Sequence, residues 1–544
     1  MKDKITSTNF IVIFSFNENY QYSLKNNQEF EINPNILYRS NESENDAKYT
    51  PRVLLFDYTS NLGSMSKEGK LLTNHLNSYN KMIQQQQDRS GGDGMASFIS
   101  QPVGNPMNRK DETVDYRSST FEYWSDYMHT DLNGLSVIDV NSNSLPSTLS
   151  SSGSLFDDGI EILGDTTALT ERYQDNLRRM IEECDQLQGF QAFADVDGLW
   201  GGMTTSILSH LSDEYGSRPV ITFGSTPYSP LVHSNNQSVI EERLFNTTKA
   251  VSSISQFSSI YIPISSQHWD TINQSNFNTL NMNNNYQTSS IIASAIDTAT
   301  LYYRSNYPYS LGEFCRSLSV QSLNLCTLST TFPSSIAKLG IKRSNANNYN
   351  NSPYTYPSTP LFSNPALHYL TPFISNVQKS SFSEIISIRG DPIDEESNTI
   401  ESQQSYDSVK KIIEGYIEFS KKNSIYSPQT TAICNISQPF IVDSLRFPAY
   451  NITKQKSQNS TAMEIDGQVA AKYDEPPQSI LSHIQNGPLI ASYLKPLCQQ
   501  FKELTKSRNV QVYRTDEDPT SNEMIIEHLH SLNDSYSNVS NHNF

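Results

Sequence analysis

The chain has 544 residues, with 39 Lys and Arg against 57 Asp and Glu, so its formal net charge is −18 at pH 7. This charge argues against a general electrostatic grip on nucleic acid or on anionic lipid. At about 150 residues per domain, the length predicts two to four domains. Hydrophobic residues make up only 36% of the chain, so the 30 Tyr and 24 Phe are expected to supply much of the core.

Two further features of the sequence indicate the cellular compartment in which the protein is expected. The chain has no run of about 18 apolar residues, and its start, MKDKITSTNF, lacks the apolar core of a secretory signal, so we expect a soluble intracellular protein. Its cysteines are odd in number and have no close pairs, which favours free, buried thiols over disulfides or a zinc site. They are Cys184, Cys315, Cys326, Cys434 and Cys498.

The predicted elements alternate between strands and helices. Apolar runs rich in β-branched and aromatic residues predict strands at 10–16, 53–58, 189–196, 220–223, 259–265 and 323–329. Apolar positions at three- and four-residue steps predict helices at 168–187, 203–215, 289–304, 492–506 and 523–532. A strand, a glycine-bearing turn, a helix and a further strand form the unit of a parallel sheet with crossover helices.

Polar, low-complexity stretches interrupt this pattern at 84–94, 140–154, 343–360 and 454–477. They lack the apolar periodicity that would offset the entropy of ordering them, so we interpret them as insertions in surface loops.

One loop suggests chemistry, because Gly198, Gly201 and Gly202 stand between a predicted strand and a predicted helix. Glycines at a helix start let backbone N–H groups approach an anion, and the helix dipole favours phosphate there. These glycines are therefore candidates for a vestigial nucleotide site. The alternative is a structural turn between strand and helix.

The neighbours of these glycines count against nucleotide binding. Asp195 and Asp197 would repel a phosphate, while Leu199 and Trp200 add bulk where close approach is needed. The loop also has no lysine, so it is not the GxxxxGK[ST] pattern.

No other set of residues predicts a catalytic or metal site. His528 and His530 are two apart on a predicted helix, where their side chains point to different faces. The sequence has no G-x-S-x-G elbow, so a serine hydrolase has no anchor. We therefore predict no catalytic residues, no metal and no cofactor.

Several motifs carry a resemblance to known proteins. The segment EECDQLQGFQ at 182–191, followed by SHLSDEYGSRPV at 209–220, resembles tubulin. The motifs ILYRS at 36–40, YTPRVLLFDYTSNLGSMSKEG at 49–69, WSDYM at 124–128 and ASAIDTATLYYR at 293–304 resemble the Misato family, a divergent branch of the tubulin and FtsZ superfamily.

The resemblance implies an α/β, tubulin/FtsZ-like fold, in which helices flank a parallel sheet and a second α/β part and C-terminal helices follow. It assigns residues 6–135 to an N-terminal tubulin-like segment, 136–160 to a polar linker and 161–340 to a tubulin-like domain with a degraded nucleotide loop. Residues 341–365 are then a polar insertion, and 366–544 a C-terminal region with its own insertion near 454–477.

The resemblance also bears on the nucleotide site. It places Asn246 where a tubulin-like fold has an asparagine that contacts guanine, and Glu313 is the only carboxylate in the segment 305–318, where a tubulin-type GTPase has a water-orienting acid. The loop DGLWGG departs from tubulin's GGGTGSG, and FNENYQYS at 16–23 lacks the glycine of tubulin's early nucleotide loop. These departures predict a non-enzyme with degenerate GTPase motifs.

The function that the resemblance implies is the regulation of mitochondrial distribution, morphology and inheritance. The expected location is the cytoplasm and the cytoplasmic face of the mitochondrial outer membrane, with peripheral membrane contact only. Expected partners are outer-membrane or cytoskeletal proteins, including tubulin or chaperonin, and no nucleic acid. Two alternatives stay open: a tubulin-like polymer protein that binds or hydrolyses GTP, and a cytoskeletal assembly factor that acts with tubulin or chaperonin in chromosome segregation.

Overall fold

The computed structural model describes about half of the chain. The described residues are 32–41, 48–71, 123–128, 131–140, 155–164, 168–184, 186–227, 236–267, 269, 282, 285–305, 309–331, 341–343, 354–356, 367–374, 381–390, 412–419, 430–436, 480–506 and 520–538. The strand predicted at 10–16 and most of the four polar insertions lie outside these residues.

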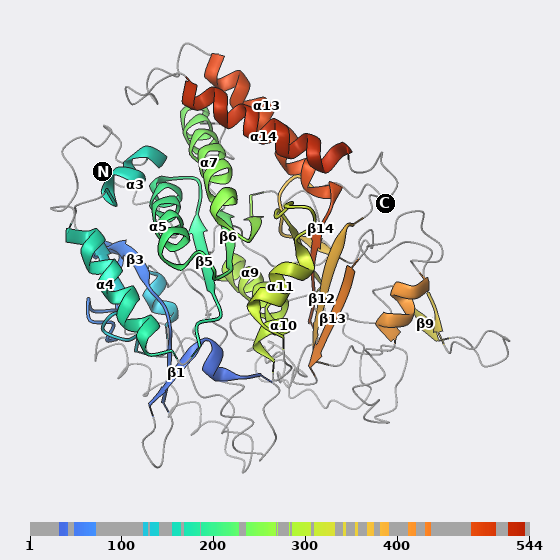
Figure 1. The fold of residues 1–544 in the computed structure, drawn as a ribbon, viewed down its shortest axis with the longest axis horizontal. Helices are drawn as coiled ribbons and strands as arrows, with labels where there is room; N and C mark the ends of the chain where they lie inside the picture. The colour runs from blue at the N-terminus through green and yellow to red at the C-terminus, as the bar shows by residue number, and fades with distance from the viewer. Residues whose placement is uncertain are drawn as a thin grey trace, which may run out of the picture.

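The N-terminal part contains two small sheets (Figure 1). Strands β1 and β2 form an antiparallel pair, whereas β3 and β4 pair in parallel, with Leu55 opposite Val137. The indole N–H of Trp124 donates a hydrogen bond of 2.7 Å to the buried carboxylate of Asp57 on β3. The elements are η1 (Pro34–Ile36), β1 (Tyr38–Asn41), β2 (Lys48–Pro51), β3 (Leu55–Tyr58), η2 (Thr59–Asn61), η3 (Trp124–Tyr127) and β4 (Val137–Val140).

The central part is a parallel three-stranded sheet in the order β5-β6-β7. Helices α5 and α7 connect its strands, and α3 and α4 lie beside α5 (Figure 1). Every residue of β7 is buried, as expected for a strand covered on both faces. The elements are α3 (Phe156–Ile162), α4 (Ala168–Glu182), β5 (Phe190–Asp195), α5 (Leu199–Tyr215), β6 (Val220–Thr226), α7 (Gln237–Phe257) and β7 (Ile260–Ser265).

A second sheet is mixed and has the order β11-β8-β14-β12-β13. Strand β14 is antiparallel to both of its neighbours, whereas β12 and β13 are parallel. A single bridge between Tyr261 and Leu325 connects β7 with the residues just before β8. The strands are β8 (Thr327–Thr331), β11 (His368–Tyr369), β12 (Ser383–Arg389), β13 (Thr430–Ile436) and β14 (Ile480–Asn486), and β9 (Lys342–Arg343) pairs with β10 (Tyr354–Thr355) separately.

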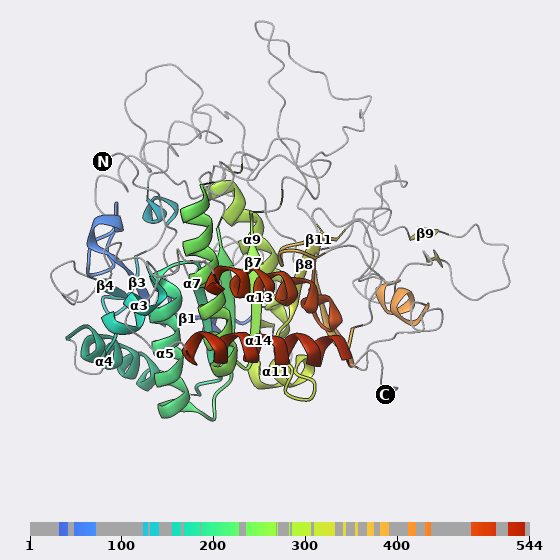
Figure 2. The ribbon, with the colours of Figure 1, turned by 90° about the horizontal axis from the view of Figure 1, so that it is seen from above.

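Helices join the two sheets. Asp297 lies in the segment that connects β7 with β8, and its buried carboxylate accepts a hydrogen bond of 2.5 Å from Arg304. The same carboxylate also forms an ion pair with Arg389 of β12. Two C-terminal helices lie side by side across α7 (Figure 2). The helices are α9 (Asn285–Ala299), α10 (Leu301–Arg304), α11 (Leu311–Leu318), η6 (Pro488–Ile490), α13 (Ala491–Lys506) and α14 (Thr520–Asn538).

The predicted α/β class is confirmed, as are most of the predicted elements. The helix expected at 168–187 is α4, and the strands expected at 189–196, 220–223 and 259–265 are β5, β6 and β7. All five cysteines are free, and four of them are buried. Among the described residues, no helix combines the length and the apolar character that crossing a membrane requires.

Several boundaries differ from the prediction. Helix α5 begins at Leu199, inside the expected glycine loop, because Leu199 and Trp200 are buried in the core. The helix expected at 289–304 is divided at Thr300 into α9 and α10. Strand β4 and the first five residues of α3 lie in the segment 136–160, which was expected to be a polar linker. The sequence analysis did not predict α3, α7 or the strands β12 to β14.

The buried His368 generates a prediction about acid stability. Burial lowers the pKa of His368 from 6.5 to about 4, and its ring packs edge-on against Trp269, with ring centroids 5.1 Å apart. Because burial disfavours the protonated ring, the neutral ring of His368 contributes about 3 kcal/mol to the free energy of unfolding. This contribution is fully present above pH 6.5 and is lost as the pH falls toward 4.

We expect His368→Phe to lose less stability than the wild type between pH 6.5 and 4, measured by urea unfolding at fixed pH. The carboxylates that also titrate there are common to both proteins, so they cancel in the difference. Equal losses in the two proteins would contradict the assignment.

Candidate functional site

The predicted glycine loop is a short connection between β5 and α5. Strand β5 ends at Asp195, and the backbone N–H of Asp197 donates to the Asp195 carboxylate at 3.2 Å. Gly198 is the N-cap residue of α5 and has extended backbone angles. Gly201 and Gly202 are not loop residues, because they lie in the first turn of the helix.

Gly202 is the point at which α5 touches α3. A β-carbon at position 202 would overlap the carbonyl oxygen of Phe156 and lie 2.9 Å from its carbonyl carbon. The contact is reciprocal, because a β-carbon at Gly159 of α3 would overlap the carbonyl oxygen of Leu199 and lie 2.7 Å from the backbone nitrogen of Met203. The two helices therefore meet backbone to backbone, which only glycine allows at these positions.

Gly201 faces a different helix. A β-carbon there would lie 2.8 Å from the Ala250 side chain of α7 and 3.3 Å from the carbonyl oxygen of Val196. The first turn of α5 is thus packed against α7 through Gly201 and against α3 through Gly202.

Asn246 lies next to these glycines and is almost fully buried on α7. Its side-chain oxygen accepts a hydrogen bond of 2.9 Å from the backbone N–H of Phe156, at the start of α3. Its side-chain nitrogen donates one of 3.1 Å to the carbonyl oxygen of Asp197. One amide therefore joins α7, α3 and the loop after β5.

Two carboxyl groups and one guanidinium lie around the loop and interact within the protein. Burial raises the pKa of Asp195 well above its usual value, and the neighbouring charge of Asp197 adds to the shift. Asp197 forms an ion pair with Arg243 of α7, which also donates to the carbonyl oxygen of Pro227 at 2.7 Å. Neither the carboxylates nor this guanidinium favours an incoming anion.

A second ion pair fixes α3 to α7. The ammonium of Lys249 donates to both carboxylate oxygens of Asp157, at 2.7 and 2.6 Å. It also lies 4.9 Å from the centre of the Phe245 ring, close enough for a cation–π interaction. The glycine loop has no lysine of its own, and Lys249 stabilises the contact between α3 and α7.

The two bulky residues of the loop point into the core. Leu199 and Trp200 are buried with Phe56 and Tyr173, and the Trp200 ring packs edge-on against Tyr58 of β3 at a centroid distance of 5.4 Å. The sequence analysis expected these two side chains to obstruct an approaching phosphate. They instead pack against β3 and so fix the start of α5 to the N-terminal sheet.

Glu313 is the third residue of α11 and takes part in the cap of that helix. Its carboxylate accepts a 2.7 Å hydrogen bond from the backbone N–H of Ser310, and its own N–H donates to the Ser310 hydroxyl, which makes a capping box at the start of α11. The hydrogen bond from the Ser310 backbone lowers the pKa of Glu313.

The two C-terminal histidines are not brought together. Ser252 of α7 and Nδ1 of His528 share a hydrogen bond of 2.9 Å, whereas His530 is exposed. Within the described ranges, no three His, Cys, Asp or Glu side chains are arranged to hold a metal ion.

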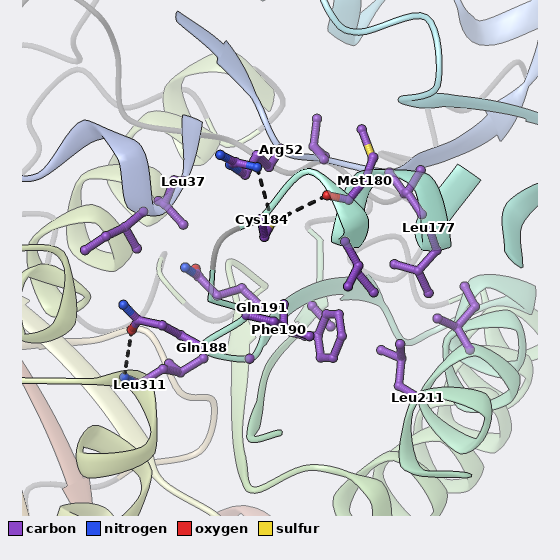
Figure 3. A pocket seen from close by; sticks show the side chains of 18 of the residues that line it. Leu37, Arg52, Leu177, Met180, Cys184, Gln188, Phe190, Gln191, Leu211 and Leu311 are labelled. Carbon is purple, nitrogen blue, oxygen red and sulfur yellow. Dashed lines mark hydrogen bonds between the residues drawn. The ribbon is translucent and has the colours of Figure 1, made fainter. Parts of the chain in front are cut away.

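The sequence analysis did not anticipate a cavity of about 600 Å³ at the opposite end of β5 (Figure 3). It lies between β3 and β5, which belong to different sheets, and helices α4 and α5 also line it. Most of its lining is apolar, and at one side Arg52 donates to the sulfur of Cys184 at 3.2 Å. Such a lining offers no paired acid and base for catalysis.

Comparisons with known proteins agree with the motif resemblance. A family model described as the Misato Segment II tubulin-like domain matches residues 6–109, and one described as the tubulin domain matches residues 113–305. The glycine loop and Asn246 lie within the second match.

Three relatives illustrate the extent of the similarity. The protein dml1 of Aspergillus clavatus is 26% identical over 295 residues, which cover 53% of this chain and 56% of the relative. The protein misato of Drosophila melanogaster is 27% identical over 361 residues, 57% and 60% of the two chains. The protein misato homolog 1 of Mus musculus is 27% identical over 312 residues, 50% and 52%. The chain spans about half the length of the curated relatives it matches.

The glycine contacts generate a prediction about stability. Gly202→Ala should destabilise the protein by about 1–3 kcal/mol, because its β-carbon meets the rigid backbone of α3. Gly312→Ala in α11 is the matched control, since a β-carbon there meets nothing closer than the Ser310 hydroxyl at 3.7 Å. The control should be neutral or stabilising by up to about 1 kcal/mol. Chemical denaturation measures both, and a neutral Gly202→Ala would contradict the close packing.

Proposed function

The chain belongs to the Misato family of tubulin-like proteins, and on this premise we propose that it is a non-enzymatic protein that regulates mitochondrial distribution, morphology and inheritance. The mitochondrial part of the proposal rests on the role that the family resemblance implies. The non-enzymatic part rests on the geometry around the glycine loop.

The packing of α3 onto the first turn of α5 is the observation that carries the proposal. A phosphate cradle needs glycine faces that are open to the ligand, so that backbone N–H groups can surround the anion. Here Gly202 is in contact with the backbone of Phe156, and Gly201 is in contact with Ala250. The glycines are used for contacts between helices.

The hydrogen bonds and charges support the same proposal. Asn246, the candidate for guanine recognition, bonds to the backbone of α3 and of the loop through both ends of its amide. The nearby cations, Arg243 and Lys249, are paired with Asp197 and Asp157. Nucleotide binding would have to break contacts that are already satisfied, at a cost of about 1–3 kcal/mol for each buried polar group left without a partner.

The proposed location is the cytoplasm and the cytoplasmic face of the mitochondrial outer membrane. A net charge of −18 opposes direct adsorption to an anionic bilayer, so we propose peripheral contact through a partner protein. Outer-membrane and cytoskeletal proteins, including tubulin or chaperonin, are the proposed class of partner.

A calorimetric titration tests the non-enzymatic part. We expect GTP and GDP with Mg²⁺ to give no saturable heat with the full chain at nucleotide concentrations up to 1 mM, roughly the weak end of specific ligand affinities. Tubulin stripped of exchangeable nucleotide is the positive control in the same buffer. Saturable binding that Asn246→Ala abolishes without loss of folding would overturn this part and favour the GTP-binding alternative.

Depletion in cells tests the mitochondrial part. We expect loss of the protein to alter the mitochondrial network, and a tagged copy to sediment in part with mitochondria and to be released from them by alkaline carbonate. Re-expression of the untagged protein is the control for specificity. A normal network together with no mitochondrial fraction would refute this part, and resistance to carbonate would refute the peripheral contact.

A further inference from the structure

The cavity beside β5 has a polar side and an apolar side. Its volume of about 600 Å³ falls within the roughly 300–1,000 Å³ of ordinary ligand pockets. Three of the residues that line it, Asn35, Gln186 and Gln188, are exposed, so this side is in contact with water. Figure 3 shows Gln188 on one side of the cavity and the apolar side chains of Leu177 and Leu211 on the other. A ligand that enters past the amides would therefore reach an apolar space.

Arg52 supplies the one charge of this lining. Among the described residues that line the cavity, no other side chain is charged at pH 7. Its Nε donates to the carbonyl oxygen of Tyr38 at 3.2 Å, and its Nη1 donates to the sulfur of Cys184 at 3.2 Å (Figure 3). The thiol of Cys184 donates in turn to the carbonyl oxygen of Met180 at 3.4 Å, so both acceptors of the guanidinium are uncharged.

The pairing of Arg52 differs from that of the buried cations elsewhere in the fold. Arg243, Lys249 and Arg304 each form an ion pair with a carboxylate, whereas no carboxylate of the described residues pairs with Arg52. A guanidinium has five N–H donors in a planar fork, and the described residues accept from only two of those of Arg52. The remaining donors match the two oxygens of an incoming carboxylate.

We propose that this cavity binds a fatty acid, with its carboxylate at Arg52 and its alkyl chain between Leu177 and Leu211. A small polar anion would leave the apolar walls without contacts, and an uncharged lipid would not use the guanidinium. The class of ligand that satisfies both features is a carboxylate with an apolar tail. The cavity lies at the opposite end of β5 from the glycine loop, so the proposal is independent of both parts of the proposed function.

A titration series tests the tail. The full chain is titrated calorimetrically with octanoate, decanoate and dodecanoate, each below its micelle concentration. We expect one saturable site and an affinity that rises by roughly tenfold for each two methylenes added, because each methylene leaves water for the apolar walls.

Variants test the carboxylate and the cavity separately. Arg52→Gln should weaken decanoate by at least about tenfold and leave 1-decanol within about twofold, because it removes the charge and keeps hydrogen-bond donors. Leu177→Trp should weaken both ligands by at least about tenfold, because the indole occupies the space of the tail. The matched controls, which do not line the cavity, are Arg179→Gln at an exposed arginine of α4 and Leu532→Trp at a half-buried leucine of α14.

Both controls should leave both ligands within about twofold of the wild type, and thermal unfolding should show that all four variants fold. If Leu177→Trp does not fold, the comparison of Arg52→Gln with Arg179→Gln decides alone.

Three outcomes would overturn the proposal. Absence of saturable heat with decanoate and dodecanoate would mean that the cavity does not admit a ligand in solution. Equal losses of decanoate in Arg52→Gln and Arg179→Gln would mean that the guanidinium does not recognise the carboxylate. Binding that a folded Leu177→Trp leaves unchanged would mean that the fatty acid binds elsewhere on the protein.

Discussion

The close approach of α3 to α5 is the contact on which the rest of this structure depends. Gly159 and Gly202 bring two helix backbones together, and Gly201 brings α5 against α7 on its other side. Since packed interiors tolerate little change in volume, these positions fix three helices relative to one another. Helix α7 in turn contacts α13 and α14, so the same arrangement supports the C-terminal helices. The short turn from β5 to α5 alone could not fix the positions of these helices relative to one another.

The polar contacts follow from that approach. Once α3 lies against α5, the backbone N–H of Phe156 is buried and needs an acceptor, which Asn246 supplies. Asp157 is likewise brought to Lys249, whose ammonium is almost fully buried and would be costly without a partner. Buried asparagine and lysine on α7 are therefore consequences of how α3 is held, and a nucleotide is not needed to explain either residue.

The sequence predicted those elements whose buried faces are apolar. Helix α4 and strands β5, β6 and β7 carry the expected apolar patterns, and β6 and β7 are buried along most of their length. Helix α7 was missed because Asn246, Thr248 and Ser252 are among its buried residues and conceal an apolar period. The candidate residues Gly198, Gly201, Gly202 and Asn246 lie near one another, as the resemblance implies, and whether they bind a nucleotide stays a prediction. Their contacts could not be predicted, because α3 is far away in the sequence and carries no signal of its own beyond Gly159.

The same glycines can serve a phosphate or a helix, and the difference has a thermodynamic consequence. A fold that leaves its glycine face open to a nucleotide gains stability from the ligand in proportion to the logarithm of its concentration. A fold that covers this face with its own α3 obtains the equivalent contacts within the chain, at the entropic cost of ordering only seven helical residues. On the proposed function, the stability of this protein would not depend on nucleotide supply. The tubulin-like frame would then act as a scaffold, held by the contacts of α3 with α5 and α7.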